Sequence, residues 1–147
     1  MVFNNTIGEP GFLYHGSPKI NIKTLKPVPS TILNDEAAVF AGELWIGIVC
    51  TRVWSDKDIR VGKVNDRPYI SEVYKDAFSS LYTLGGWLYT VSNKTFIHDK
   101  RLTNFEYISH SEVPILKMEY VQKPLVILKN IDVNIIYYKE RLKSIDW

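Results

Sequence analysis

Residues 11–19 read GFLYHGSPK, and in this segment a histidine stands at the end of a short apolar run. The apolar residues 12–14 have the character of a buried strand, which ends at His15. Gly16 follows at once, and a glycine lets a ligand or another backbone come close enough to use its N–H and C=O groups. Ser17 adds a hydroxyl. The strand end is therefore a candidate ligand-binding edge, although a histidine bonded to nearby backbone would give the same pattern.

The length and composition of the chain describe one compact domain, which we place at residues 1–147. A content of 46% hydrophobic and 13% aromatic residues suits a packed core. The formal net charge of +2 is too small to indicate a dedicated nucleic-acid-binding protein, which would carry a clustered basic patch. An enzyme, a binding module and an interaction protein all remain open.

The expected compartment follows from the single cysteine and from the first residues. Cys50 has no second cysteine to pair with, which fits a reducing environment. The start MVFNNTIGEP has no basic segment followed by an apolar one, and no apolar run approaches the length of a membrane span. We expect a cytoplasmic protein without membrane attachment, and a viral or phage protein made inside a host cell fits equally. The sequence does not indicate an oligomeric state.

Strands dominate the predicted elements. Apolar and β-branched runs predict strands at 37–41, 87–91, 105–109, 113–121 and 125–130. Dense prolines favour an irregular loop with short extended pieces over 18–35, and charged residues with Gly and Asn favour a connector over 56–68.

Helical spacing is clearest over 68–82, where apolar residues recur every three or four positions between Pro68 and Gly85–Gly86. Residues 44–54 fit a helix or a strand, and residues 133–145 fit a strand, a helix, or a strand leading to a helix. The order of elements does not alternate strand and helix. It predicts an α+β fold with a mostly antiparallel sheet and one or two helices.

Three short motifs, in order, resemble the ADP-ribosyltransferase superfamily, in particular its poly(ADP-ribose) polymerase and diphtheria-toxin branch. They are LYHGSP at 13–18, AAVFAG at 37–42 and FEYIS at 105–109. The family carries a His-Gly-Ser strand end, a Tyr-Phe-Ala strand and a late Glu-Tyr-Ile strand. The resemblance implies a split antiparallel sheet with NAD, the substrate, bound in the cleft.

The resemblance also implies roles for individual residues. His15 and Glu106 would be catalytic. His15 would bond the adenosine-side ribose and Glu106 the nicotinamide-side ribose, where a carboxylate stabilises the oxocarbenium-like transition state. The reaction would transfer ADP-ribose to a protein, a nucleic acid or water, and would release nicotinamide. The residues implied in NAD binding are Tyr14, His15, Gly16, Ser17, Phe40, Ala41 and Trp45.

The chain departs from the family in its middle motif. The positions of two stacking tyrosines and one amide-binding serine correspond to Val39, Cys50 and Gly47. One interpretation is that another ring stacks on nicotinamide, from among Trp45, Trp54, Tyr69 and Tyr82. A second is a catalytically inactive module that binds NAD, ADP-ribose or a protein partner. A third is an interaction protein whose likeness to the family is accidental.

The remaining polar residues give weaker signals. Glu112 is the second candidate for the catalytic carboxylate. His15, His98 and His110 lack metal-ligand spacing, so no metal is expected. Lysines at 19, 23 and 26 form either a solvated surface or a contact to a phosphate-bearing acceptor.

Overall fold

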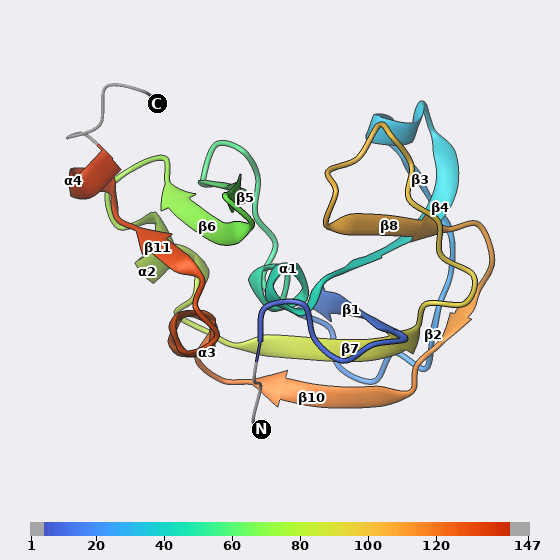
Figure 1. Cartoon of the computed structure of the whole chain (residues 1–147). Helices are drawn as coiled ribbons and strands as arrows, with labels where there is room; N and C mark the ends of the chain where they lie inside the picture. Colours follow the sequence, from blue (N-terminus) through green and yellow to red (C-terminus); the bar gives the residue numbers. More distant parts are fainter. Residues whose placement is uncertain (1–4, 142–147) are drawn as a thin grey trace.

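The computed structural model describes residues 5–141 and has the expected α+β fold, with mostly antiparallel sheets. The main sheet has the strand order β10-β7-β1-β4-β3, and β8 pairs with β4 (Figure 1). Its strands are β1 Phe12–Ser17, β3 Val28–Ser30, β4 Glu36–Gly42, β7 Gly86–Ser92, β8 Glu106–Ser109 and β10 Lys117–Val121. A small pair, β2 (Thr24–Leu25) with β9 (Val113–Pro114), lies beside this sheet.

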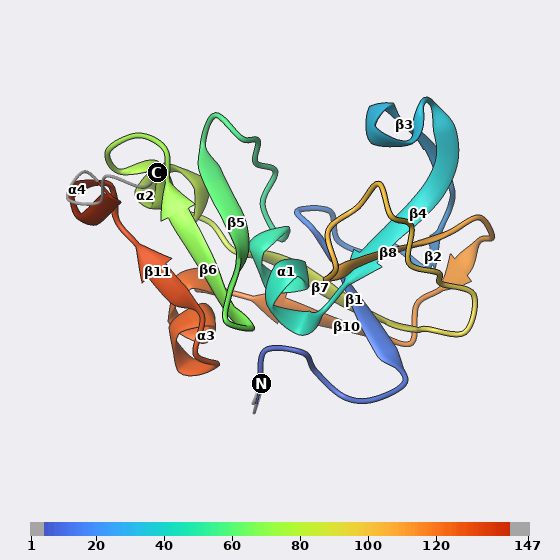
Figure 2. The same cartoon turned by 45° about the horizontal axis from the view of Figure 1, so that its top comes forward.

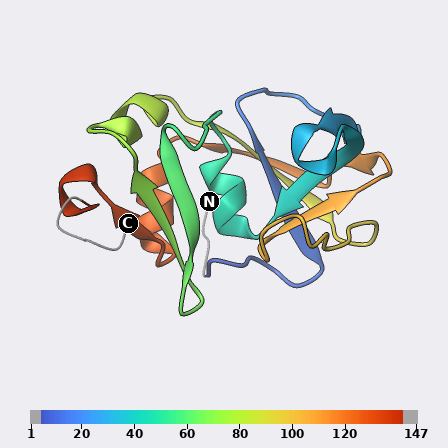
Figure 3. The same cartoon turned by 90° about the horizontal axis from the view of Figure 1, so that it is seen from above.

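A second sheet has the order β11-β6-β5 and lies on the other side of helix α1 (Figures 2 and 3). Its strands are β5 Ile59–Val64, β6 Arg67–Glu72 and β11 Asn134–Ile136, with β11 parallel to β6. The helices are α1 Leu44–Val49, α2 Ala77–Leu81, α3 Pro124–Asn130 and α4 Tyr138–Arg141, with a 3-10 turn η1 at Thr31–Leu33. The described residues thus contain four short α-helices where one or two were expected.

Helix α1 is the centre of the core. All six of its residues, LWIGIV, are buried, as expected for a helix that is apolar on every side. The largest hydrophobic cluster joins α1 to Tyr14 and Leu88 of the main sheet and to Ile59 and Ile70 of the second sheet. This cluster therefore joins both sheets.

The main sheet is split between β1 and β4. β1 pairs with β7 along its whole length, but its register with β4 is the single pair Tyr14↔Gly42. β4 pairs instead with β8, from Val39↔Ser109 to Gly42↔Glu106. The two strands therefore separate just after Tyr14, which places His15 at the point of separation.

The prediction of a helix over 68–82 is wrong for its first part, because residues up to Glu72 belong to strand β6. Asn65 and Asp66 both have positive φ, of 51° and 63°, and make the tight turn that pairs β5 with β6. The prediction of a connector over 56–68 is also wrong in part, because residues 59–64 form strand β5. The residue before Pro68 favours extended backbone, so the proline that suggested a helix start fits a strand as well. Only Ala77–Leu81 is helical.

The strand expected over 125–130 is also wrong, because these residues belong to helix α3. Pro124 stands in its first turn, and Pro124 and Leu128, four positions apart, are its buried residues. The strand expected over 113–121 is interrupted into β9 and β10. The strands expected at 37–41, 87–91 and 105–109 are confirmed as β4, β7 and β8.

The two ambiguous segments resolve differently. Residues 44–49 form helix α1, and 134–136 form a strand that leads to helix α4. The part of the latter prediction beyond residue 141 lies outside the described residues. The proline-rich segment 18–35 carries only the short pieces β2, β3 and η1, as expected.

Candidate functional site

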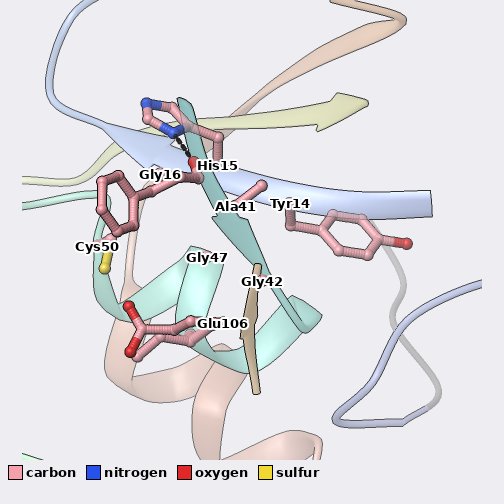
Figure 4. A pocket seen from close by; sticks show the side chains of 10 residues that line it. Tyr14, His15, Gly16, Ala41, Gly42, Gly47, Cys50 and Glu106 are labelled. Atoms are coloured by element: carbon pink, nitrogen blue, oxygen red, sulfur yellow. Dashed lines mark hydrogen bonds between the residues drawn. The ribbon is translucent and has the colours of Figure 1, made fainter. Parts of the chain in front are cut away.

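A pocket of about 100 Å³ opens where β1 and β4 separate (Figure 4). It is lined by Tyr14, His15, Gly16, Phe40, Ala41, Gly42, Ile46, Gly47, Cys50 and Glu106. Ligand sites for whole drug-sized molecules usually have roughly 300–1,000 Å³. This pocket is therefore large enough for one small ring, and a dinucleotide would place most of its length outside it.

His15 spans the split with its side chain. Its Nδ1 lies 2.7 Å from the carbonyl oxygen of Phe40. Because a carbonyl only accepts, Nδ1–H is the donor, and the neutral ring keeps Nε2 as an acceptor. Burial lowers the pKa of His15, and the bond to Phe40 opposes that shift in part. The ring is therefore neutral near pH 7, with Nε2 able to accept a hydroxyl proton.

Glu106 lies on the other side of the same pocket, at the first position of β8. Its carboxylate points toward Cys50 and the C-terminal part of α1 (Figure 4). The hydroxyl of Thr103 donates to its Oε1 at 2.8 Å, which fixes one oxygen. Folding thus brings His15 and Glu106, far apart in the sequence, to one pocket.

Two glycines let β1 approach α1 at the pocket floor. A Cβ at Gly16 would lie 2.0 Å from the carbonyl oxygen of Gly47, and a Cβ at Gly47 would lie 2.7 Å from the Cβ atom of Tyr14. No side chain fits at either contact. Gly16 therefore has a packing function here, whether or not its backbone also meets a ligand.

Cys50 lines the pocket beside Glu106. Burial raises the pKa of its thiol to about 11, a hydrogen bond from Trp54 lowers it in part, and the charge of Glu106 raises it further. The thiol is therefore protonated near neutral pH and is not an activated nucleophile.

Besides His15, four of the residues expected to bind NAD line the pocket, namely Tyr14, Gly16, Phe40 and Ala41. The ring of Tyr14, however, points away from it, and its hydroxyl accepts the N–H of Glu9 at 3.0 Å (Figure 4).

Ser17 and Trp45 lie outside the pocket. Ser17 Oγ accepts the N–H of Lys19 at 3.0 Å. Trp45 is fully buried, packs at a tilt against Phe105 with ring centroids 4.7 Å apart, and donates its indole N–H to Glu43.

The four rings that could stack on nicotinamide differ in how deeply they are buried. Trp45 and Tyr82 are core residues, and Tyr82 donates its hydroxyl proton to Val49. Tyr69 belongs to the second sheet. Trp54 is half-buried and contacts Cys50 of the pocket. Trp54 is therefore connected to the pocket through Cys50, although it does not itself line the pocket.

Val39, at the family's tyrosine position, is buried in a second cluster with Leu13 and Val91. A ring at this position would meet the core instead of the pocket. The sequence analysis named neither Gly42 nor Ile46 as a pocket residue, and it gave Cys50 as a position where the family's ligand contact is missing. The four-residue spacing of Ile46 and Cys50 is the signal for these two, because such spacing places side chains on one face of a helix. Gly42 ends strand β4 and belongs to no helix.

Glu112, the competing carboxylate, is exposed and does not line the pocket. Lysines 19, 23 and 26 are also exposed. Within residues 5–141, no group of three or more His, Cys, Asp and Glu side chains could hold a metal ion. No helix in that range has the length and apolar character needed to cross a membrane.

Comparison with known proteins adds no further constraint, since no family model, curated protein or solved structure matches this chain. The function must be argued from the pocket itself.

Proposed function

We propose that this chain is a NAD-dependent ADP-ribosyltransferase that acts inside a cell and releases nicotinamide. The observation that carries the proposal is that His15 and Glu106 line one pocket at the split of the sheet. The three-motif resemblance assigns roles to the same two residues. The pocket volume suits the nicotinamide end of NAD, with the rest of the molecule extending past His15.

In the proposed reaction, the bond between nicotinamide nitrogen and ribose C1′ breaks, and its electron pair leaves with nicotinamide. C1′ then bonds to an oxygen or nitrogen of a protein or nucleic-acid acceptor, or of water, whose proton goes to solvent or to Glu106. The Glu106 carboxylate stabilises the positive charge that develops on the ribose. Thr103 holds this carboxylate in place through its 2.8 Å hydrogen bond.

The other groups of the pocket position NAD. The free Nε2 of neutral His15 accepts a hydroxyl proton of the adenosine-side ribose. We assign the ring that stacks on nicotinamide to Trp54, which is hydrogen-bonded to Cys50 of the pocket but does not itself line it. Neither role requires the tyrosine that Val39 replaces.

The test is nicotinamide release from NAD by the purified chain. We expect Glu106→Gln to lower the rate by about 100-fold or more, because an electrostatic contact that forms in the transition state is lost. Glu112→Gln is the matched control, since it removes an exposed carboxylate outside the pocket. Equal rates for the wild type and Glu106→Gln would overturn the assignment of Glu106.

A second candidate is a module of the same fold that binds NAD or ADP-ribose without turnover. The small pocket, together with Val39 and Gly47 at positions where the family has ligand contacts, favours it. Calorimetric binding of ADP-ribose with no nicotinamide release would select this candidate. Measurable release that depends on Glu106 would exclude it.

A further inference from the structure

Strand β10 leaves one edge of the main sheet open. It ends the strand order, and its only strand partner within residues 5–141 is β7 (Figure 1). Open edges present backbone donors and acceptors that can pair with another strand. The question is which strand fits this edge.

The two faces of β10 have different characters. Met118 and Tyr120 are 38% and 46% exposed, and Tyr120 packs against Trp87 of the neighbouring strand with ring centroids 5.0 Å apart. Lys117 and Glu119 point to the other face and form an ion pair at 2.9 Å. Edge strands are commonly protected by unpaired lysines. Here the charge of Lys117 is balanced by Glu119, so the edge as a whole is not repulsive.

The order Lys117-Met118-Glu119 is complementary to itself in one antiparallel register. When two copies pair edge to edge about a two-fold axis, paired residues must lie on the same face, so the axis passes through a residue position. An axis at Lys117 would place the lysines of the two copies opposite each other, and an axis at Glu119 would do the same with the two glutamates. An axis at Tyr120 would place Lys117 of one copy opposite Lys123 of the other. An axis at Met118 places each Lys117 opposite Glu119 of the second copy.

We propose that two copies of this chain pair antiparallel through β10, with Met118 opposite Met118 of the second copy. The main sheets of both copies then form one continuous sheet. Two Lys117–Glu119 pairs form on one face, and opposite charges placed directly across two strands stabilise their pairing. On the other face, the two Met118 side chains lie between the Trp87–Tyr120 pairs. This inference does not rest on the proposed function, because β10 contributes no residue to the pocket.

Sedimentation velocity and light scattering over a range of concentrations test the proposal. A single pair of strands buries less than the roughly 1,600 Å² of a standard interface, so we expect reversible association at about micromolar concentrations. The mass should rise toward twice the 17.0 kDa of one chain.

Charge reversal separates pairing from folding. In a dimer of Lys117→Glu, acidic side chains lie opposite each other across the two strands, and in a dimer of Glu119→Lys, basic side chains do. Each variant alone should therefore associate about tenfold more weakly or worse. An equimolar mixture of the two variants restores both opposite-charge pairs and should form a heterodimer. The double variant Lys117→Glu/Glu119→Lys should dimerise like the wild type.

The control is Lys94→Glu, which reverses an exposed lysine in the turn after β7 and should leave association unchanged. Melting temperatures confirm that each variant folds. The mixing experiment distinguishes the proposal from lost monomer stability, because mixing does not repair a misfolded chain. A wild type that stays monomeric at all concentrations, or single variants that dimerise as the wild type does, would overturn the proposal.

Discussion

Gly16 lies where β1 crosses α1, and this close approach makes a specific prediction. An added Cβ would lie 2.0 Å from the Gly47 carbonyl oxygen, which belongs to buried backbone that cannot move aside. Gly16→Ala should therefore lower the unfolding free energy by about 1–3 kcal/mol, measured by urea denaturation. Gly62→Ala is the control, since the nearest atoms there belong to the end of the Tyr69 side chain. Equal losses for both variants would contradict the packing role of Gly16.

His15 links stability to pH. Burial lowers its pKa below the ordinary 6.5, so the folded state favours the neutral ring. The unfolded chain takes up the proton first, and the stability contributed by His15 is complete above about pH 6.5 and falls as the pH drops toward the lower folded pKa. Between about pH 7.5 and about pH 5.5, the wild type should lose more unfolding free energy than His15→Gln, which cannot titrate. Parallel urea midpoints for the two proteins across this range would contradict the prediction.

The site illustrates what local motifs can identify. His15 and Glu106 stand in short sequence motifs and do line one pocket. Trp45 is one of four rings that could replace the missing stacking tyrosine, and its burial against Phe105 removes it from the pocket. Ile46 could not be predicted as a neighbour of Cys50, because residues 44–54 fit both a helix and a strand, and only the helix places the two side chains together.

At the scale of elements, Glu72 joins three segments that are separate in the sequence. It is the last residue of β6 and is 3% exposed. Its Oε2 accepts the N–H of Phe78 in α2, and its Oε1 accepts the N–H of Tyr138 in α4, each at 2.9 Å. A single buried carboxylate therefore fixes both helices to the second sheet.

Removing this carboxylate should be costly. Glu72→Ala leaves two backbone donors without their acceptor, and hydrogen bonds to charged groups contribute about 1.5–3 kcal/mol each. We expect a loss of about 2–4 kcal/mol of unfolding free energy, measured by urea denaturation. Glu72→Gln keeps one acceptor oxygen and should lose less. If Glu72→Ala is no less stable than Glu72→Gln, the two backbone contacts do not carry the stability we assign to them.

The elements that sequence patterns misassigned are those whose partners lie far along the chain. Residues 68–82 have helical spacing, but Ile70 pairs with Val61 on one side and Ile135 on the other, and these pairings override the local preference. Residues 125–130 form an apolar run that fits a strand, yet Pro124 and Leu128 turn one face of a helix to the core. Strands β4, β7 and β8 were predictable because their short apolar runs are bounded by turn residues.

At the scale of the whole molecule, the two sheets share the largest hydrophobic cluster, and the main sheet has two smaller clusters besides. Side chains of the main sheet, such as Leu88, and of the second sheet, such as Ile70, belong to one cluster around α1. Neither sheet can lose its packing against α1 without exposing apolar surface of the other. The chain should therefore unfold as one cooperative unit.

Cys50, the only cysteine, makes this cooperativity measurable. It follows the last residue of α1, and its thiol, with a pKa raised to about 11, should react slowly with a thiol reagent while the core is intact. Across a urea titration, the rise in Cys50 labelling should have the same midpoint as the change in fluorescence of the four tryptophans. Cys50→Ala, followed by fluorescence alone, shows whether the probe itself alters stability. Labelling that precedes the fluorescence change would mean that α1 opens while one sheet stays folded, and the cluster that the two sheets share would then not govern unfolding.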